Sequence, residues 1–393
     1  MTDYCAYAVE LRRKLHQCPE IGFDLPKTLA IVKGELDRWG IPYTEEFGSS
    51  SVVATINPGC SGFTIGLRAD MDALPIEEKT GLPFASRHPG AMHACGHDVH
   101  TANLLAVGRR LKDMEDQLRC RVKLLFTPAE EYIRPGSKYM VENGVMDDID
   151  CAVALHVDGT KNLGVIGLLD GPTHANSMGV MVDLYGVPAH ASQQHKGVDA
   201  VAMAFQFYQA MLQLKAKEVN PLDACLVHVG TIHGGSTNNI VCDHVQMFCS
   251  LRAHTDELTD FLLRRTREIA AGVAAVNGGR AEVEVTKLLP HGYNHPLMYR
   301  QLKAAAASVV GEENVVPYRR GLGGEDFGFM TRKKPSVFFR MGTRTGPKTG
   351  FPAHSDQFDV DEGCFAIGSE IFIRFVLENQ DGIEGLPDHV VLP

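Results

Sequence analysis

Apolar residues recur along positions 1–176 with two different periods, and together these predict an α/β unit. Residues 4–17 and 28–39 repeat apolar side chains at helical spacing, and the same pattern returns after residue 101. Short apolar runs typical of buried strands occupy residues 51–56, 64–69, 121–126 and 151–156. Strands that alternate with helices predict a mostly parallel sheet with helices on both faces.

A different order of elements occupies residues 177–290. Strand patterns cover residues 178–185, 224–232, 245–253 and 281–286, and helical patterns cover residues 198–214 and 256–276. Thr255 precedes the second helix as a candidate N-cap. The order βαββαβ is that of a ferredoxin-like unit. We therefore expect one α/β domain made of residues 1–176 and 291–393, interrupted by an inserted ferredoxin-like domain of residues 177–290.

Composition narrows the class of protein. The chain has 393 residues, 44% of them hydrophobic and 22% charged, which is typical of a globular protein. A net charge of -10 argues against a nucleic-acid partner, and neither a basic block nor an apolar run of membrane-spanning length is present. The ten cysteines are scattered without a CxxC pair, and the first 15 residues lack the apolar core of a signal peptide. We expect a cytoplasmic location.

The stretch from His93 to Thr101 carries unusual chemistry. It holds one thiol, three imidazoles and one carboxylate within nine positions. Cys95 and His97 are the best candidate metal ligands, because Gly96 between them lets the backbone turn so that both can reach one cation. A lone cysteine is most often a small core residue, but a cluster of titratable groups favours a metal site.

Further ionisable residues follow the predicted strands, and they are Asp70, Asp72, Glu130, Glu131 and His156. Charges clustered where buried strands end suggest the edge of a site. Thr127 and Pro128 also fit the start of a helix with Glu130 at its third position, so helix capping alone could explain Glu130. His156 could be ordinary polar filling at a strand end.

Five motifs in order resemble the di-metal amidohydrolases of the aminoacylase and carboxypeptidase type. The motifs are His93-Ala94-Cys95-Gly96-His97-Asp98, Pro128-Ala129-Glu130-Glu131, Leu155-His156, Gly324-Glu325-Asp326-Phe327, and His354 near Phe358. The branch in question contains hippurate hydrolases, N-acetyl-diaminopimelate deacetylases and plant hydrolases of auxin–amino-acid conjugates. The resemblance covers nearly the whole chain.

The resemblance implies a role for each matching residue. The family's metal ligands fall on Cys95, His97, Glu131, His156 and His354. Its general base falls on Glu130. In the family, the inserted domain is a lid that also forms the homodimer. Its conserved histidine, which reaches the active site of the partner subunit in related enzymes, falls on His190, and the lid asparagine falls on Asn239. Judged alone, His190 is more often a solvated side chain. Two divalent metal ions are expected, zinc or manganese, with cobalt or nickel as alternatives.

The chain also departs from the family. Residues 132–136 replace glycines that usually follow the Glu-Glu pair, and Gln194 and Cys242 stand where proline is common. Arg134 and Arg252 could contact an acidic substrate, although ordinary surface pairing explains both. The implied activity is hydrolysis of the amide bond of an N-acyl amino acid or a related small conjugate. The alternatives are a dipeptidase or carboxypeptidase, and a non-catalytic metal-stabilised binding protein.

Overall fold

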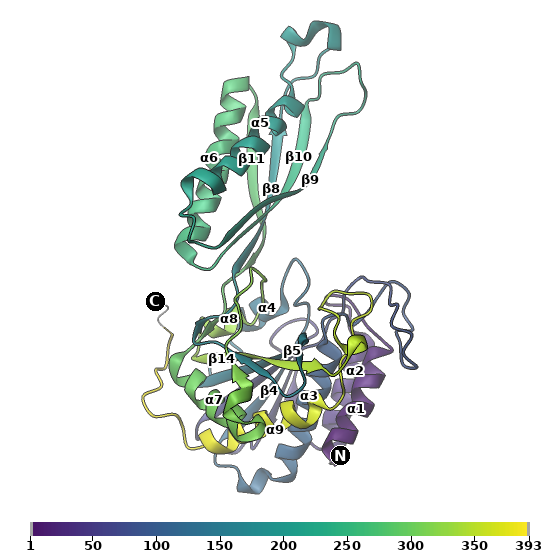
Figure 1. The fold of residues 1–393 in the computed structure, drawn as a ribbon, viewed down its shortest axis with the longest axis vertical. Helices are drawn as coiled ribbons and strands as arrows, with labels where there is room; N and C mark the ends of the chain where they lie inside the picture. The colour runs from purple at the N-terminus through teal and green to yellow at the C-terminus, as the bar shows by residue number, and fades with distance from the viewer. Residues whose placement is uncertain (1–2, 391–393) are drawn as a thin grey trace. The chain divides into compact units, whose positions relative to one another are not determined.

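The structure is a computed structural model, and it describes residues 3–390. Its contacts divide the chain into two compact units (Figure 1). Within the described residues, the first unit comprises residues 3–173, 292–319 and 326–390, and the second comprises His174–His291 and Arg320–Glu325. The short segment Arg320–Glu325 lies outside the range 177–290 that the sequence pattern marks as the insertion.

An eight-stranded sheet forms the centre of the first unit, in the order β1-β2-β4-β3-β5-β14-β6-β13. Its strands are β1 (Tyr43–Thr44), β2 (Val52–Ile56), β3 (Thr64–Asp70), β4 (Arg121–Thr127), β5 (Cys151–Asn162), β6 (Ile166–Leu168), β13 (Val315–Val316) and β14 (Ser336–Arg344). The central run β4-β3-β5-β14 is parallel throughout, whereas β1, β2 and β6 pair antiparallel with their neighbours β2, β4 and β14. The mostly parallel sheet predicted from the sequence is confirmed.

Helices cover both faces of this sheet (Figure 1). They are α1 (Asp3–His16), α2 (Pro26–Arg38), α3 (His97–Asp113), α4 (Gly136–Glu142), α7 (Pro296–Val310), α8 (Gly328–Thr331) and α9 (Cys364–Asn379). Along β5, Val153 and Leu155 pack into the core under α1, α3, α7 and α9, while Ala152 and Ala154 pack into a smaller core with α4 and α8. Burial on both faces explains why the strands are apolar at nearly every position.

The second unit has its own sheet and its own core. Its antiparallel strands lie in the order β11-β8-β10-β9, with bounds β8 (Asn176–Tyr185), β9 (Cys225–Gly234), β10 (His244–Ala253) and β11 (Arg280–Leu289). Helices α5 (Ala200–Gln213) and α6 (Asp256–Asn277) pack on it. Along the chain this is βαββαβ, so the ferredoxin-like prediction is confirmed. Thr255 caps α6 as expected, because its side chain accepts a hydrogen bond from Leu258 N.

A minor two-stranded sheet completes the first unit. It pairs β7 (Gly171–Pro172) with β12 (Tyr293–Asn294), the segments on either side of the second unit in the sequence. Within residues 3–390, no helix is long and apolar enough to cross a membrane.

Candidate metal centre

The loop before α3 turns sharply at Gly96. Gly96 has a φ of +86°, a left-handed conformation that favours glycine. A β-carbon there would lie only 2.3 Å from Cγ2 of Val157. The turn places Cys95 before the first turn of α3 and His97 as its first residue. Glycine is therefore required both by the backbone conformation and by the close approach of β5.

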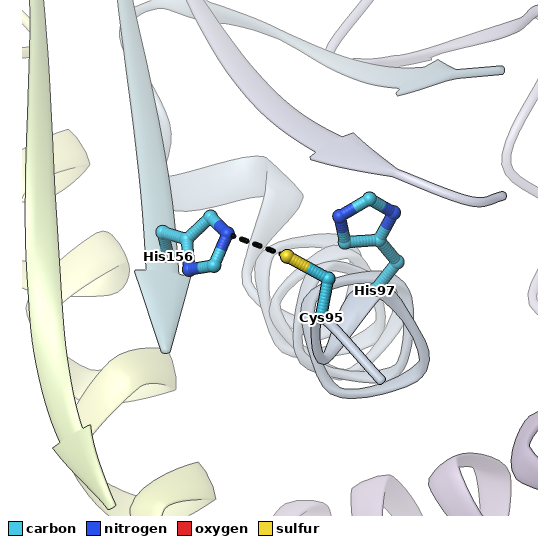
Figure 2. Close-up of side chains that lie close together, drawn as sticks. All are labelled: Cys95, His97 and His156. Carbon is cyan, nitrogen blue, oxygen red and sulfur yellow. Dashed lines mark hydrogen bonds between the residues drawn. The ribbon is translucent and has the colours of Figure 1, made fainter. Parts of the chain in front are cut away.

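Cys95, His97 and His156 form the first group of potential ligands. Their donor atoms all lie within 4.8 Å of one another. Figure 2 shows the three side chains converging, with His156 on β5 and the other two beside the start of α3. The Cys95 sulfur lies 3.4 Å from Nε2 of His156. One thiol and two imidazoles in this arrangement are a ligand set typical of zinc and similar d-block cations.

A second group shares the same thiol. Cys95, Glu131 and His354 also have donor atoms within 4.8 Å, and so do His97, Glu130 and Glu131. Nε2 of His354 lies 2.8 Å from Oε1 of Glu131. All five ligands predicted from the sequence, together with Glu130, therefore occupy one continuous cluster.

Backbone contacts hold the two loops of this cluster. The His354 amide donates to the carbonyl of Ala94 at 2.7 Å, and His354 has a φ of +68°. The carboxylate of Asp72 accepts from the amides of Glu130 and Glu131 at 2.9 and 3.1 Å. The capping explanation of Glu130 is wrong, because residues 128–131 are not helical and Ala129 has a φ of +57°.

The protonation states of His156 and Glu131 suit metal binding directly, whereas a cation would have to displace a proton from His97. Burial disfavours the charged form of His97, but Asp70 and Asp72 outweigh burial and raise the pKa of His97 well above its usual value. Burial, followed by the nearby charge of His100, lowers the pKa of His156 well below its usual value, so the ring is in the neutral form that binds metals. Burial opposes ionisation of Glu131, but its bond to His354 and the charge of His97 outweigh burial and lower the pKa of Glu131. Both groups therefore offer free electron pairs at neutral pH.

The donor set fits a divalent cation. Burial raises the pKa of the Cys95 thiol well above its usual value, so a thiolate there needs a cation beside it. Nε2 of His97 is buried, and it has no hydrogen-bond partner within residues 3–390. Its other nitrogen, Nδ1, lies 2.8 Å from the carbonyl oxygen of Asp72, which orients the ring. An oriented imidazole with one unused nitrogen is the usual state of a metal ligand.

Two residues near the ligands have supporting roles that the sequence did not reveal. Nδ1 of His100 lies 2.6 Å from Asp70, and its Nε2 accepts from the amide of Val157 at 3.0 Å. Because both nitrogens of His100 are used, it orients the strand that carries His156 rather than binding metal. Asp70 in turn pairs with the buried guanidinium of Arg68 at 2.8 Å. In the sequence, His100 belongs to the crowded stretch 93–101 and Asp70 to the charges at strand ends, but neither pattern indicates that the two residues are partners.

The remaining predicted residues lie in the second unit. His190 is exposed, and its Nδ1 lies 2.8 Å from Oγ of Ser192. Ala191 N donates to the carbonyl of Asn239, so the segments that carry His190 and Asn239 are neighbours. The guanidinium of Arg252 donates to the carbonyl of Leu322 at 2.8 Å, which gives this arginine a structural contact.

Comparison with known proteins identifies the family. The model of peptidase family M20/M25/M40 matches residues 66–378. The chain belongs to this family. N-acetyl-L-cysteine deacetylase of Bacillus subtilis is 35% identical over 354 residues, covering 90% of this chain and 83% of the relative. IAA-amino acid hydrolase ILR1-like 4 of Arabidopsis thaliana is 30% identical, covering 96% of this chain and 87% of the relative.

A solved structure supports the same assignment. The YXEP protein of Bacillus subtilis, a dinuclear metal-binding peptidase of the M20 family, is 28% identical, with a TM-score of 0.81 over 95% of this chain and 98% of its own. The resemblance drawn from the motifs is thus confirmed. The protein is an M20 metallo-hydrolase that acts on amide or peptide bonds.

Proposed function

We propose that this M20 hydrolase cleaves the amide bond of N-acyl amino acids or related small conjugates at a centre of two divalent cations. The observation that carries the proposal is the single cluster in which thiol, imidazole and carboxylate groups surround Glu130. Two relatives named for removing acyl groups or for splitting amino-acid conjugates support this substrate class.

The proposed ligands are Cys95, His97, Glu131, His156 and His354. The thiol of Cys95 belongs to both groups of donors, which would let it serve two cations. A thiolate favours zinc, while carboxylate and imidazole ligands also suit manganese, with cobalt and nickel as alternatives. When bound, such cations polarise the scissile carbonyl and make a nearby water more acidic.

Glu130 is proposed as the general base. It follows Ala129 in a loop held by Asp72, and it is buried beside the ligands. Its carboxylate takes a proton from water as the water oxygen bonds to the acyl carbon. Glu130 then returns this proton to the nitrogen as the carbon–nitrogen bond breaks, which releases an acid and a free amine.

His190 and Asn239 are proposed to act from the second unit as a lid. An imidazole N–H and a side-chain amide are suitable donors for the oxygen that becomes negative during attack. Such donors act only when the lid closes on the substrate. Loss of His190 should therefore lower kcat more than it raises KM.

The second unit also offers a surface for a homodimer. Strand β9 is at the edge of its sheet, and most of its residues are exposed. On α5, Phe205 is 68% exposed, and Tyr208 and Leu212 lie on the same helix as further exposed apolar residues. An open edge strand beside exposed apolar side chains is suited to pairing with a second copy.

The experiment compares hydrolysis of N-acyl amino acids and dipeptides by the metal-loaded protein and by Glu130→Gln. Glu142→Gln is the matched control, because Glu142 is an exposed acid paired with Lys138. We expect wild type and control to release free amino acid, and Glu130→Gln to lose roughly 100-fold or more in kcat while it keeps its metal.

Other outcomes decide between the alternatives. Turnover of dipeptides but not of N-acyl amino acids would assign a dipeptidase or carboxypeptidase activity. Equal turnover by Glu130→Gln and wild type would remove Glu130 from the mechanism. A cation count of one per chain would contradict the two-metal centre.

A further inference from the structure

Arg12 is a fully buried arginine that lies outside every motif described above. It is on α1, and only 1% of its surface is exposed. Its guanidinium reaches three carboxylates: Nε lies 3.1 Å from Asp98, Nη2 lies 2.6 Å from Asp359, and Nη1 lies 3.2 Å from Glu362. A planar guanidinium can hold several carboxylates in fixed directions, which a lysine cannot do.

The three carboxylates come from two segments that both carry proposed ligands. Asp98 directly follows His97 in the first turn of α3. Asp359 lies five positions after His354 in the sequence. Arg12 therefore bonds at once to the segment that carries one proposed ligand and to the segment that carries another.

The chain between these carboxylates and the ligands is tightly packed. A β-carbon at Gly96 would lie 3.5 Å from the Phe358 ring, so the residue before Asp359 packs on the turn before His97. Phe358 is itself buried in the main core. With so little free space, a displacement at Asp98 or Asp359 would be transmitted to the ligand beside it.

The charges explain why loss of this arginine would be costly. Removing a buried arginine leaves its carboxylates without a counter-charge, which is far more costly than losing a surface pair. His16, one turn further along α1, shares Asp98 with Arg12 at 2.8 Å. The neighbouring Arg13 also pairs with Glu362, but half of its side chain is exposed. Arg12 is thus the member of this pair that links both ligand segments.

We propose that Arg12 is a positioning residue of the metal centre, which sets the distance between the Cys95–His97 turn and the His354 loop. The inference rests on the proposed ligand set. It adds a group on α1 to a site otherwise built from strand ends, loops and the first residue of α3. Asp359 is its link to His354, and Asp98 is its link to His97.

The test is cobalt(II) titration of the metal-free full chain, followed by absorbance. Charge-transfer absorbance from a thiolate to cobalt reports on Cys95, and elemental analysis counts the cations. In Arg12→Gln we expect cobalt affinity to fall roughly 10- to 100-fold, the usual effect of losing a group that supports a ligand. Arg12→Lys should recover only part of this loss.

Asp359→Asn keeps the test decisive if Arg12→Gln does not fold. This variant removes the negative charge from one of the two contacts between Arg12 and the segment after His354, and it leaves the contact with Asp98 unchanged. We therefore expect the cation near His354 to be bound more weakly while the thiolate band persists. Two controls separate positioning from stability. Arg13→Gln leaves the buried contacts intact, and Leu11→Ala loosens α1 through its buried core residue.

The outcomes are distinct from those that test the proposed function. Wild-type affinity and spectrum in Arg12→Gln and Asp359→Asn would overturn the role of Arg12, and so would an equal loss of affinity in Leu11→Ala. If wild type binds two cations but hydrolyses none of the panel substrates, the proposed function fails, and the cobalt titration still measures the role of Arg12.

Discussion

Gly96→Ala tests whether the turn before α3 needs glycine for the two reasons seen in the structure. The substitution adds one methyl group at a residue with a φ of +86°. The new carbon would lie 2.3 Å from Cγ2 of Val157 and 3.5 Å from the Phe358 ring. The first distance is well inside van der Waals contact, so either the turn or β5 must move.

The magnitude follows from two separate costs. A left-handed conformation costs an L-residue about 1–2 kcal/mol relative to glycine. Forcing an extra methyl group into a packed interior costs about 1–3 kcal/mol more. We therefore expect the free energy of unfolding to fall by roughly 2–5 kcal/mol. Because Val157 follows His156, relief of the clash would also separate His156 from Cys95 and weaken metal binding.

Urea unfolding of the metal-free protein measures the cost, with two alanine controls. Gly164 has a φ of +88°, and a β-carbon added there would have no other atom within 4 Å, so Gly164→Ala carries the backbone cost alone. Gly34 lies inside α2 with the same open space, and Gly34→Ala should stabilise the helix slightly. Adding Val157→Ala to Gly96→Ala should restore part of the loss. A cost for Gly96→Ala no greater than that for Gly164→Ala would refute the steric argument.

Two further predictions concern pH and assembly. Burial disfavours the charged form of His16, but Asp98 and Glu78 outweigh burial and raise the pKa of His16 to about 9. The pKa of His16 in the folded protein is thus higher than its value of about 6.5 in the unfolded chain. The charged ring therefore contributes its full stabilisation below a pH of about 6.5, and this contribution is lost as the pH rises to about 9. Between these pH values, the free energy of unfolding measured in urea should therefore fall by roughly 3 kcal/mol more for wild type than for His16→Gln. Parallel pH profiles of the two proteins would contradict the assignment. For assembly, Phe205→Glu should convert a dimer into monomers in sedimentation velocity, whereas Val276→Glu, at an 85% exposed site on α6, should not; an unchanged dimer in Phe205→Glu would exclude this helix from the interface.

Local patterns in the sequence were sufficient for the architecture. Burial on both faces made the central strands apolar at nearly every position, and the change in the order of strands and helices marked the second unit. Cys95 and His97 were evident because several ionisable groups crowd one turn, which ordinary packing does not require. These features depend on residues close together in the sequence, so periodicity and spacing reveal them.

Groups that act across long sequence separations were not predictable in the same way. The pattern around Glu130 matched a helix start, but the carboxylate of Asp72 binds the backbone there and holds a loop instead. In the sequence, Arg12 occupies an ordinary polar position of an amphipathic helix. Its partner Asp359 is 347 residues away along the chain. Neither contact leaves a local pattern, because each depends on how the sheet brings distant loops together.

Backbone strain at the centre points to ligands that are positioned before a cation binds. Of the four non-glycine residues with positive φ within residues 3–390, Ala129 precedes Glu130 and another is His354 itself. Such conformations cost of the order of 1–3 kcal/mol each and persist only where the surroundings impose them. Here the surroundings are the Asp72 carboxylate on one loop and the Ala94 carbonyl on the other. Folding of the first unit thus offsets part of the free energy needed to arrange the ligands. A cation would therefore bind to a site that is already largely formed.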